Sequence, residues 1–252
     1  MNAEYLLILF FTVALVYSLK AFRFYFLLVG EGIPILKYLR VFARTTFVNI
    51  LLPFKCGELY RFYAFGRLTK NYAKGFSIVL LDRFIDTVSL LCIFAVLHIL
   101  GKFELGRIFT LLLLACFFLT ASYLILPGML SFWNGYFIES RPSKRHLRGL
   151  VFVGKISGVY DEIRKLVKGR FFVLFSLSLI SWCAEIFSLV LCRKFFSFET
   201  ASLVSDYLNA ALTGSDFALQ KNFVLASTAF LVSAYIVFAL AGFFNHGVKN
   251  GR

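Results

Sequence analysis

Two short charged segments stand out in an otherwise apolar chain. Glu58 and Arg61 are three positions apart. A second set consists of Asp82, Arg83 and Asp86. Residues three or four positions apart are neighbours on a helix, so each segment places opposite charges on one face. The five charges nearly cancel, as is required of a cluster whose members pair with one another. We therefore expect Arg61 and the two aspartates to depend on each other.

The depth of these charges in the chain leaves two interpretations open. An ionised side chain inside a membrane span costs a few kcal/mol unless it is paired or hydrated, so these side chains should face the protein interior. In one interpretation they form an ion-pair clasp that fastens two segments together without a ligand. In the other they line a hydrated cavity where an arginine binds a lipid phosphate through its planar guanidinium. Arg44 would then lie at the cytoplasmic entrance.

Other residue types that could carry out chemistry form no recognisable constellation. His98, His146 and His246 are scattered at span ends or in loops, and the five cysteines lack metal-ligand spacing. We therefore predict that the protein is not an enzyme and holds neither a cofactor nor a metal ion.

The composition indicates that these charges lie in a membrane protein. The chain has 252 residues, 60% hydrophobic and only 16% charged, with a mean hydropathy of +0.82. No soluble domain has this composition. A helix needs roughly 20 apolar residues to cross a bilayer, and five stretches qualify: residues 5–29, 76–100, 108–126, 171–191 and 223–244. The sequence predicts an all-α, polytopic membrane helical bundle with about five full spans, forming a single integral membrane domain over residues 1–252.

The basic residues predict the orientation of these spans. Lys20 and Arg23 follow the first apolar run, and most other lysines and arginines lie in loops 30–75 and 127–170. Because cytoplasmic loops are enriched in Lys and Arg, we expect a multi-pass protein of the cell membrane with its N-terminus outside and its C-terminus inside. The net charge of +14 then lies mostly on the cytoplasmic face, where anionic lipids are the expected partners. Nucleic acid is not an expected partner, since no basic aqueous domain is present.

Two further segments on the cytoplasmic side are amphipathic. Residues 34–52 carry basic side chains at helical spacing and are followed by Pro53 and Gly57, which favours a re-entrant helical hairpin that turns at Pro53. Residues 151–168 have apolar side chains on one face and charged side chains on the others, which is typical of an interfacial helix.

A longer pattern connects the two charged segments. Its residues are Asn49, Pro53, Gly57, Glu58 and Arg61, then Asp82, Arg83 and Asp86. In this pattern the chain resembles the lysylphosphatidylglycerol synthase/flippase transmembrane family, which includes the membrane part of the bacterial multiple peptide resistance factors. The resemblance is strongest over residues 1–100. In the fourth predicted span, Trp182 and Glu185 match a family-like Trp-x-x-Glu arrangement.

The resemblance implies a flippase-like protein that binds an anionic lipid or lipid-linked intermediate and moves it between leaflets. The implied lipid-binding residues are Arg44, Asn49, Pro53, Gly57, Glu58, Arg61, Asp82, Arg83, Asp86, Trp182 and Glu185. Residues 199–223 contain Gly214 but no proline, where family members have a Pro- and Gly-rich motif. That departure favours the alternative of a non-enzymatic membrane partner that presents lipid to a glycosyltransferase or synthase. The sequence leaves open whether the chain forms a homo-oligomer.

Overall fold

The computed structural model describes residues 3–52, 56–100, 107–139, 144–192 and 218–250. These residues form eight α-helices and contain no strand, which confirms the predicted all-α membrane bundle. The helices are α1 (Ala3–Leu28), α2 (Ile35–Leu51), α3 (Cys56–Thr69), α4 (Tyr72–Ile99), α5 (Arg107–Glu139), α6 (Lys144–Val167), α7 (Phe171–Cys192) and α9 (Ala218–Asn250).

Four of the described helices are long and apolar enough to cross a membrane. Their apolar segments are Leu7–Leu28, Phe109–Glu139, Phe171–Ser188 and Asn222–Ala241. The predicted span 76–100 is a helix, α4, but it is not among the four because Asp82, Arg83 and Asp86 lie within it. The described residues therefore contain four candidate membrane spans and one long charged helix, where the sequence predicted five spans, the second of them carrying these charges.

The predicted end of the third span at residue 126 is wrong. Helix α5 continues through Pro127 to Glu139, so it is longer than the predicted stretch 108–126. Proline removes one backbone hydrogen bond, but it is tolerated within membrane helices, where neighbouring groups satisfy the freed carbonyl.

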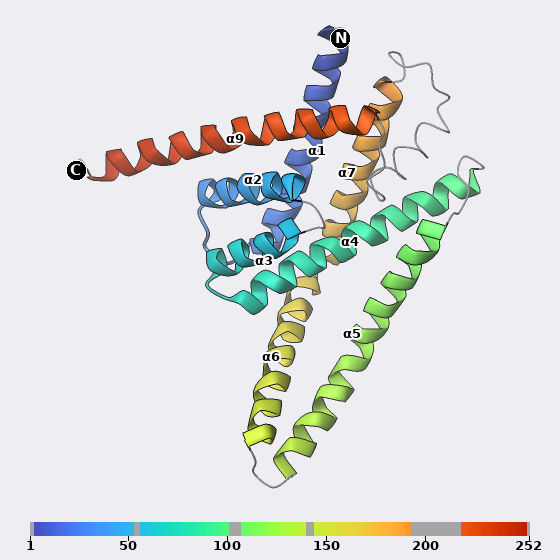
Figure 1. Ribbon diagram of the computed structural model, residues 1–252, viewed down its shortest axis with the longest axis vertical. Coiled ribbons are helices and arrows are strands. Elements are labelled where there is room, and N and C mark those ends of the chain that lie inside the picture. The colour runs from blue at the N-terminus through green and yellow to red at the C-terminus, as the bar shows by residue number, and fades with distance from the viewer. Residues whose placement is uncertain (1–2, 53–55, 101–106, 140–143, 193–217, 251–252) are drawn as a thin grey trace.

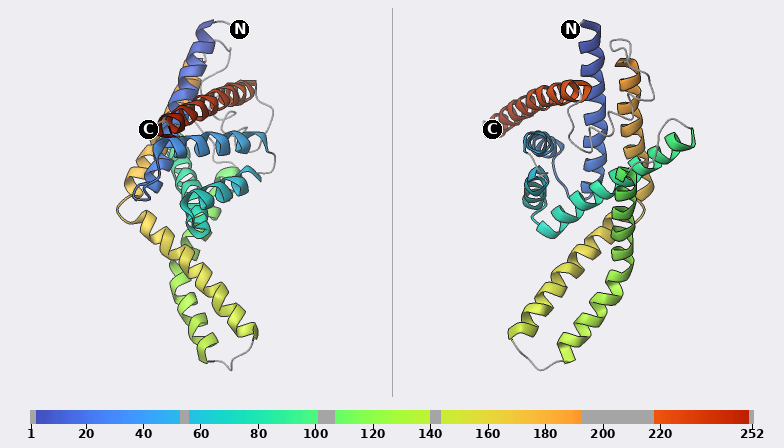
Figure 2. Two further views of the ribbon diagram at one scale, coloured as in Figure 1. Left: turned by 90° about the vertical axis from the view of Figure 1, so that its left-hand side faces the viewer. Right: turned by 45° about the vertical axis from the view of Figure 1, so that its right-hand side comes forward.

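The helices are arranged around the pair α1 and α7, which lie side by side (Figures 1 and 2). Helix α4 crosses this pair, and α2 and α3 pack as a hairpin between α4 and α9. Helix α9 crosses α1 and lies along α2. Helices α5 and α6 form a long hairpin that extends to the end of the molecule opposite the start of α1.

Glycines allow the close packing of the α2, α3 and α4 segments. A Cβ atom at Gly57 would overlap the backbone of Asn49, and one at Gly75 would overlap the backbone of Gly66. The first contact brings α3 against α2, and the second brings α4 against α3. Helices α2 and α3 therefore form a hairpin. Its re-entry into the membrane stays a prediction, and Pro53, the predicted turn, lies outside the described residues.

Helix α6 has the two faces that its sequence predicts. Leu166 is buried, whereas Arg164 and Lys165 are exposed. The helix begins at Lys144, earlier than the predicted residue 151. Its location at a membrane interface stays a prediction.

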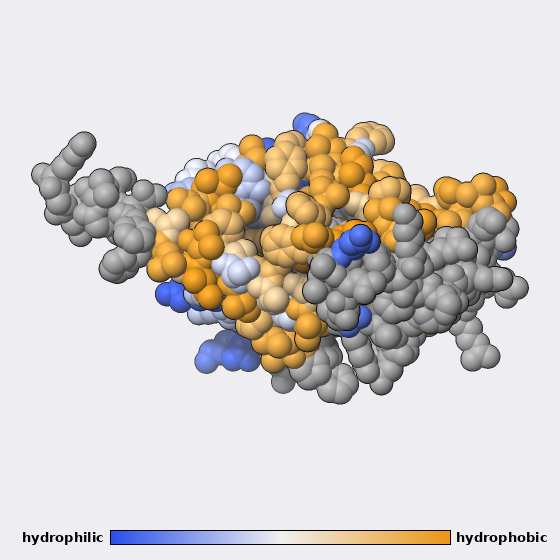
Figure 3. All heavy atoms as spheres, turned by 90° about the horizontal axis from the view of Figure 1, so that it is seen from above, coloured by the Kyte–Doolittle hydropathy of each residue, from blue (hydrophilic) through white to orange (hydrophobic). Residues whose placement is uncertain are grey.

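The described surface has the character of a membrane protein. Seen from the end at which α1 begins, hydrophobic residues cover most of it, and strongly hydrophilic residues form only isolated patches (Figure 3). Exposed apolar side chains occur along α5, whose most apolar stretch has no buried residue. In a bilayer such surface contacts lipid, so its exposure carries no penalty there.

Two apolar clusters occupy the interior, and a polar layer separates them. One contains Val13 of α1 with Leu90 and Phe94 of α4. The other contains Phe24 of α1 and Ile78 of α4. The polar layer consists of the charged side chains that lie between these residues along the two helices: Lys20 and Arg23 of α1, and Asp82, Arg83 and Asp86 of α4. The apolar packing on either side encloses them.

Candidate functional site

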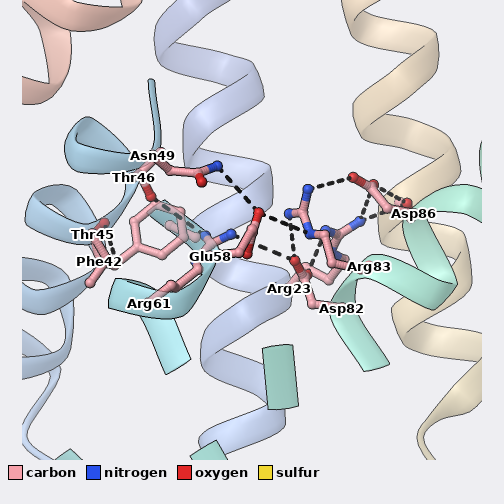
Figure 4. Close-up of polar contacts among 12 residues, drawn as sticks. Arg23, Phe42, Thr45, Thr46, Asn49, Glu58, Arg61, Asp82, Arg83 and Asp86 are labelled. Carbon is pink, nitrogen blue, oxygen red and sulfur yellow. Dashed lines mark hydrogen bonds and ion pairs between the residues drawn. The ribbon is translucent and has the colours of Figure 1, made fainter. Parts of the chain in front are cut away.

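Arg23 is the centre of the polar layer (Figure 4). Its Nη2 is 2.5 Å from Asp82 Oδ1, and its Nη1 is 2.7 Å from Asp86 Oδ1. Nη1 also donates to Ser178 Oγ at 2.6 Å, and that hydroxyl donates to Asp86 Oδ1 at 2.9 Å. The Arg23 side chain is only 2% exposed. These four residues, the charge clasp, connect α1, α4 and α7.

The sequence interpretation missed Arg23. It took Lys20 and Arg23 as an orientation signal after the first apolar run, although both lie within the predicted span 5–29, where α1 turns them into the interior. A signal for this was available, because Glu58, Arg61, Asp82, Arg83 and Asp86 together carry one excess negative charge. A buried cluster needs a further cation to be neutral, and Arg23 supplies it.

Arg83 connects the clasp to the α2–α3 hairpin. Its Nη2 donates to Asp82 Oδ2 at 2.8 Å, and its Nε lies 3.6 Å from Glu58 Oε1. Asn49 Nδ2 donates to the same Glu58 oxygen at 3.2 Å. The Arg83 side chain is 44% exposed, and its third carboxylate contact, from Nη1 to Asp86 Oδ2, is 3.8 Å. Two predicted motif segments are thus brought together through one half-exposed arginine.

Arg61 is buried but lacks a close carboxylate. Its Nη1 is 3.9 Å from Asp82 Oδ2, beyond hydrogen-bond distance. Its Nη2 is 3.5 Å from Thr46 Oγ1, and its Nε has no partner. The guanidinium lies against aromatic rings instead, 4.7 Å from the Phe24 centroid and 5.5 Å from that of Phe42. The expected dependence of Arg61 on both aspartates is therefore reduced to a loose contact with Asp82.

A cavity of about 120 Å³, here the central cavity, opens beside these arginines. Helices α1, α2, α3 and α4 line it with Tyr17, Lys20, Arg23, Phe42, Thr46, Asn49, Ile50, Arg61, Asp82, Arg83 and Asp86. A single water needs roughly 10–15 Å³ of such volume, so the cavity has room for several waters or a small charged group. Four cationic and two anionic side chains line it, and two of the cations, Lys20 and Arg83, also contact the carboxylates of Glu185 and Glu58. The lining cation without a close carboxylate is Arg61, so an anion in the cavity would find its partner there.

Lys20 links the predicted residues of α7 to this cavity. Its Nζ is 3.2 Å from Glu185 Oε2 and lies 5.6 Å from the Trp182 ring centroid. The same ammonium is 5.7 Å from the Tyr17 ring. Trp182 and Glu185 do not line the cavity themselves, but they hold a cation that does.

The remaining predicted residues lie at different places. The Arg44 guanidinium is 5.5 Å from the Tyr60 ring and does not line the central cavity. Gly57 acts through helix packing, and Glu58 reaches the cavity only through Asn49 and Arg83. Among the described residues, no group of three or more His, Cys, Asp or Glu side chains is placed to hold a metal ion.

Comparison with known protein families identifies a match to this chain. The sequence matches the family described as "Lysylphosphatidylglycerol synthase TM region" over residues 1–215, which includes all of the motif residues above. Neither the curated proteins nor the solved structures contain a match to this chain.

Proposed function

Because the chain belongs to the lysylphosphatidylglycerol synthase transmembrane family, we propose that it is a flippase-like protein of the cell membrane. It binds the headgroup of an anionic lipid or lipid-linked intermediate in the central cavity and moves that lipid between leaflets. It does not change the lipid chemically. Family membership supports a lipid-related membrane protein, and the cavity supports the choice of an anionic group.

The observation that carries the proposal is the poor pairing of Arg61. A guanidinium has five N–H donors, and in Arg61 the Nε has no partner while the nearest carboxylate oxygen is 3.9 Å away. A buried charge needs compensation by a close partner, water or a ligand. A phosphate oxygen pair matches the planar guanidinium in bidentate geometry. Arg61 therefore has the capacity for an anion at its terminal nitrogens. In Arg23 the Nε also lacks a partner, but both terminal nitrogens already contact aspartates.

The polar layer would bind this anion in the middle of the helical bundle. Apolar clusters enclose the layer on both sides, so an anionic headgroup that crosses the bundle needs its charges and waters midway. Arg44 of α2, whose guanidinium lies against the Tyr60 ring of α3, would receive the lipid on the cytoplasmic side. In this arrangement the N-terminus of the chain is outside and its C-terminus inside. Cysteine labelling of intact cells tests that orientation, because a cysteine at Lys144 should stay unlabelled.

The experiment that tests the function replaces Arg61 with Lys. Arg61→Lys keeps the positive charge but removes the planar pair of donors. Arg67→Lys is the matched control, because Arg67 is exposed on the same helix. We expect Arg61→Lys to fold, to lose co-purified phosphatidylglycerol in native mass spectrometry, and to lose leaflet exchange in proteoliposomes. Arg67→Lys should keep both. If Arg61→Lys retains and exchanges lipid as the wild type does, the cavity is not the headgroup site.

A second candidate function is lipid presentation to a membrane glycosyltransferase or synthase. The observation in its favour is the composition of residues 199–223, which contain Gly214 but no proline where relatives have a Pro- and Gly-rich motif. The same experiment separates the two functions. A wild-type protein that retains phosphatidylglycerol in an Arg61-dependent manner but moves none between leaflets is a lipid-presenting partner.

A further inference from the structure

A larger, apolar groove lies beside the central cavity. Helices α1, α2 and α9 enclose a volume of about 340 Å³ there, here the apolar groove. This lies within the range of about 300–1,000 Å³ that small-molecule sites occupy. Residues from all three helices line it, among them Ala21, Phe22, Leu39, Ala43, Ala234 and Phe238.

The apolar groove and the central cavity share part of their walls. Tyr17 and Phe42 line both. One of these shared rings, that of Phe42, lies 5.5 Å from the Arg61 guanidinium. A ligand whose anionic group contacts Arg61 therefore meets an apolar volume directly beyond Phe42. This order of a charged and an apolar site matches the order of groups in a phospholipid.

The walls of the apolar groove leave few polar groups available. The hydroxyl-bearing residues in these walls are Tyr17, Ser18, Tyr25 and Tyr38. The Tyr38 hydroxyl donates to the Ala21 carbonyl at 2.6 Å and is satisfied within the protein. On the side of α9, Arg40 Nη2 donates to the Phe238 carbonyl at 3.1 Å, which fastens α9 to α2. The groove is thus kept open between helices that are held together at its edge.

We infer that the apolar groove binds an acyl chain of the same lipid whose headgroup occupies the central cavity. This inference rests on the proposed function and specifies its substrate class. The ligand is a long-chain phospholipid bound at both ends, in contrast to a soluble phosphate ester, which would use the central cavity alone. Lipid bound in this manner depends on Arg61 as well as on the free volume of the groove.

The test uses phosphatidylglycerol with a photoreactive diazirine in its acyl chain, reconstituted with the full chain in proteoliposomes. Irradiation should place adducts on groove residues of α2 and α9, such as Leu39 and Ala234. Ala234→Trp fills the groove and should abolish these adducts. Val237→Trp is the matched control, because Val237 is 59% exposed on the same helix and does not line the groove.

Arg61→Lys provides the decisive arm, since any membrane groove can contact bulk lipid. If the same lipid occupies both sites, Arg61→Lys should also remove the groove adducts, while adducts on the exposed surface of α5 remain. Groove adducts that persist in Arg61→Lys, or a wild-type map without groove adducts, would overturn the inference. The wild-type and Arg61→Lys maps decide this even if Ala234→Trp does not fold.

Headgroup binding is measured separately with dibutyryl phosphatidylglycerol, whose chains are too short to fill the groove. Ala234→Trp should bind it as the wild type does, because the central cavity is unchanged. Arg61-dependent binding of this short-chain lipid without groove adducts overturns only the acyl-chain site. Absence of short-chain binding in the wild type overturns the proposed function and the acyl-chain site with it.

Discussion

Two interior arginines, Arg23 on α1 and Arg61 on α3, have opposite surroundings. Arg23 has carboxylate oxygens at 2.5 and 2.7 Å, whereas the nearest one to Arg61 is 3.9 Å away. Both are almost fully buried. Burial alone therefore does not distinguish a structural charge from one that is available to a ligand, and the geometry of pairing does. Under the proposed function, Arg23 corresponds to the ion-pair interpretation of the charged cluster and Arg61 to the headgroup interpretation.

The comparison predicts its largest effect at Arg23. Arg23→Ala leaves Asp82 and Asp86 buried without their closest partner, and breaking such a pair typically costs about 3–5 kcal/mol. We expect a loss of this size in the free energy of unfolding, measured by chemical denaturation in detergent. Arg67→Ala, at an exposed position, should change it by less than about 0.5 kcal/mol. Equal stability of the two variants would show that the clasp does not hold the bundle together.

Double variants sharpen the same comparison. Residues in direct contact show coupling of about 0.5–3 kcal/mol in double-mutant cycles, and separate ones are nearly additive. Arg23→Ala with Asp86→Ala should therefore be milder than the sum of the two single changes. Arg61→Ala with Asp86→Ala should be additive, because Arg61 contacts Asp82 and not Asp86. Coupling between Arg61 and Asp86 would contradict the division of roles.

The second effect concerns a bound lipid. A ligand that binds only the folded state at 100 times its dissociation constant stabilises it by about 2.7 kcal/mol. Dibutyryl phosphatidylglycerol should stabilise the wild type by this amount, while dibutyryl phosphatidylcholine should have a smaller effect. The stabilisation should disappear in Arg61→Lys and persist in Arg67→Lys. Thermal unfolding in detergent measures it, and equal stabilisation of both variants would place the anion elsewhere.

The third effect arises from the packing that positions Arg61. Gly57→Ala places a methyl group against the Asn49 backbone, and overpacking of this kind costs about 1–3 kcal/mol. Because the change separates α2 from α3, retention of phosphatidylglycerol should fall as well. Gly158→Ala is the control, since a Cβ atom there meets open space on α6. Native mass spectrometry and denaturation read out the two effects, and a neutral Gly57→Ala would mean that the hairpin adjusts freely.

The sequence predicted the elements of the site better than its connections. The hairpin, the charged segment of α4 and Glu185 all follow from residue types, spacing and the family pattern. Arg23 was missed because a basic residue near the end of an apolar run fits an orientation signal as well as a buried ion pair. The partner of Glu185, Lys20, was missed for the same reason.

The apolar groove could not be predicted from any local pattern. It is formed where α1, α2 and α9 cross, and residues such as Ala43 and Ala234 are far apart in the chain. Hydrophobic residues occur on every face of the long spans, so periodicity does not indicate which face lines a groove. Only the three-dimensional packing of the helices determines where such a volume remains.

Arg83 should show the smallest effect, because solvent reaches its side chain. It has one close carboxylate, Asp82 at 2.8 Å, yet its side chain is 44% exposed. Solvent screens such pairs, and they contribute only about 0.2–1 kcal/mol. Arg83→Lys should therefore cost less than about 1 kcal/mol of unfolding free energy. If Arg83 shares the phosphate with Arg61, the variant should retain phosphatidylglycerol with lower affinity but still exchange it. A complete loss of lipid in Arg83→Lys, with Arg61→Lys unaffected, would reverse the roles of the two arginines and place the headgroup at the exposed side of the cavity.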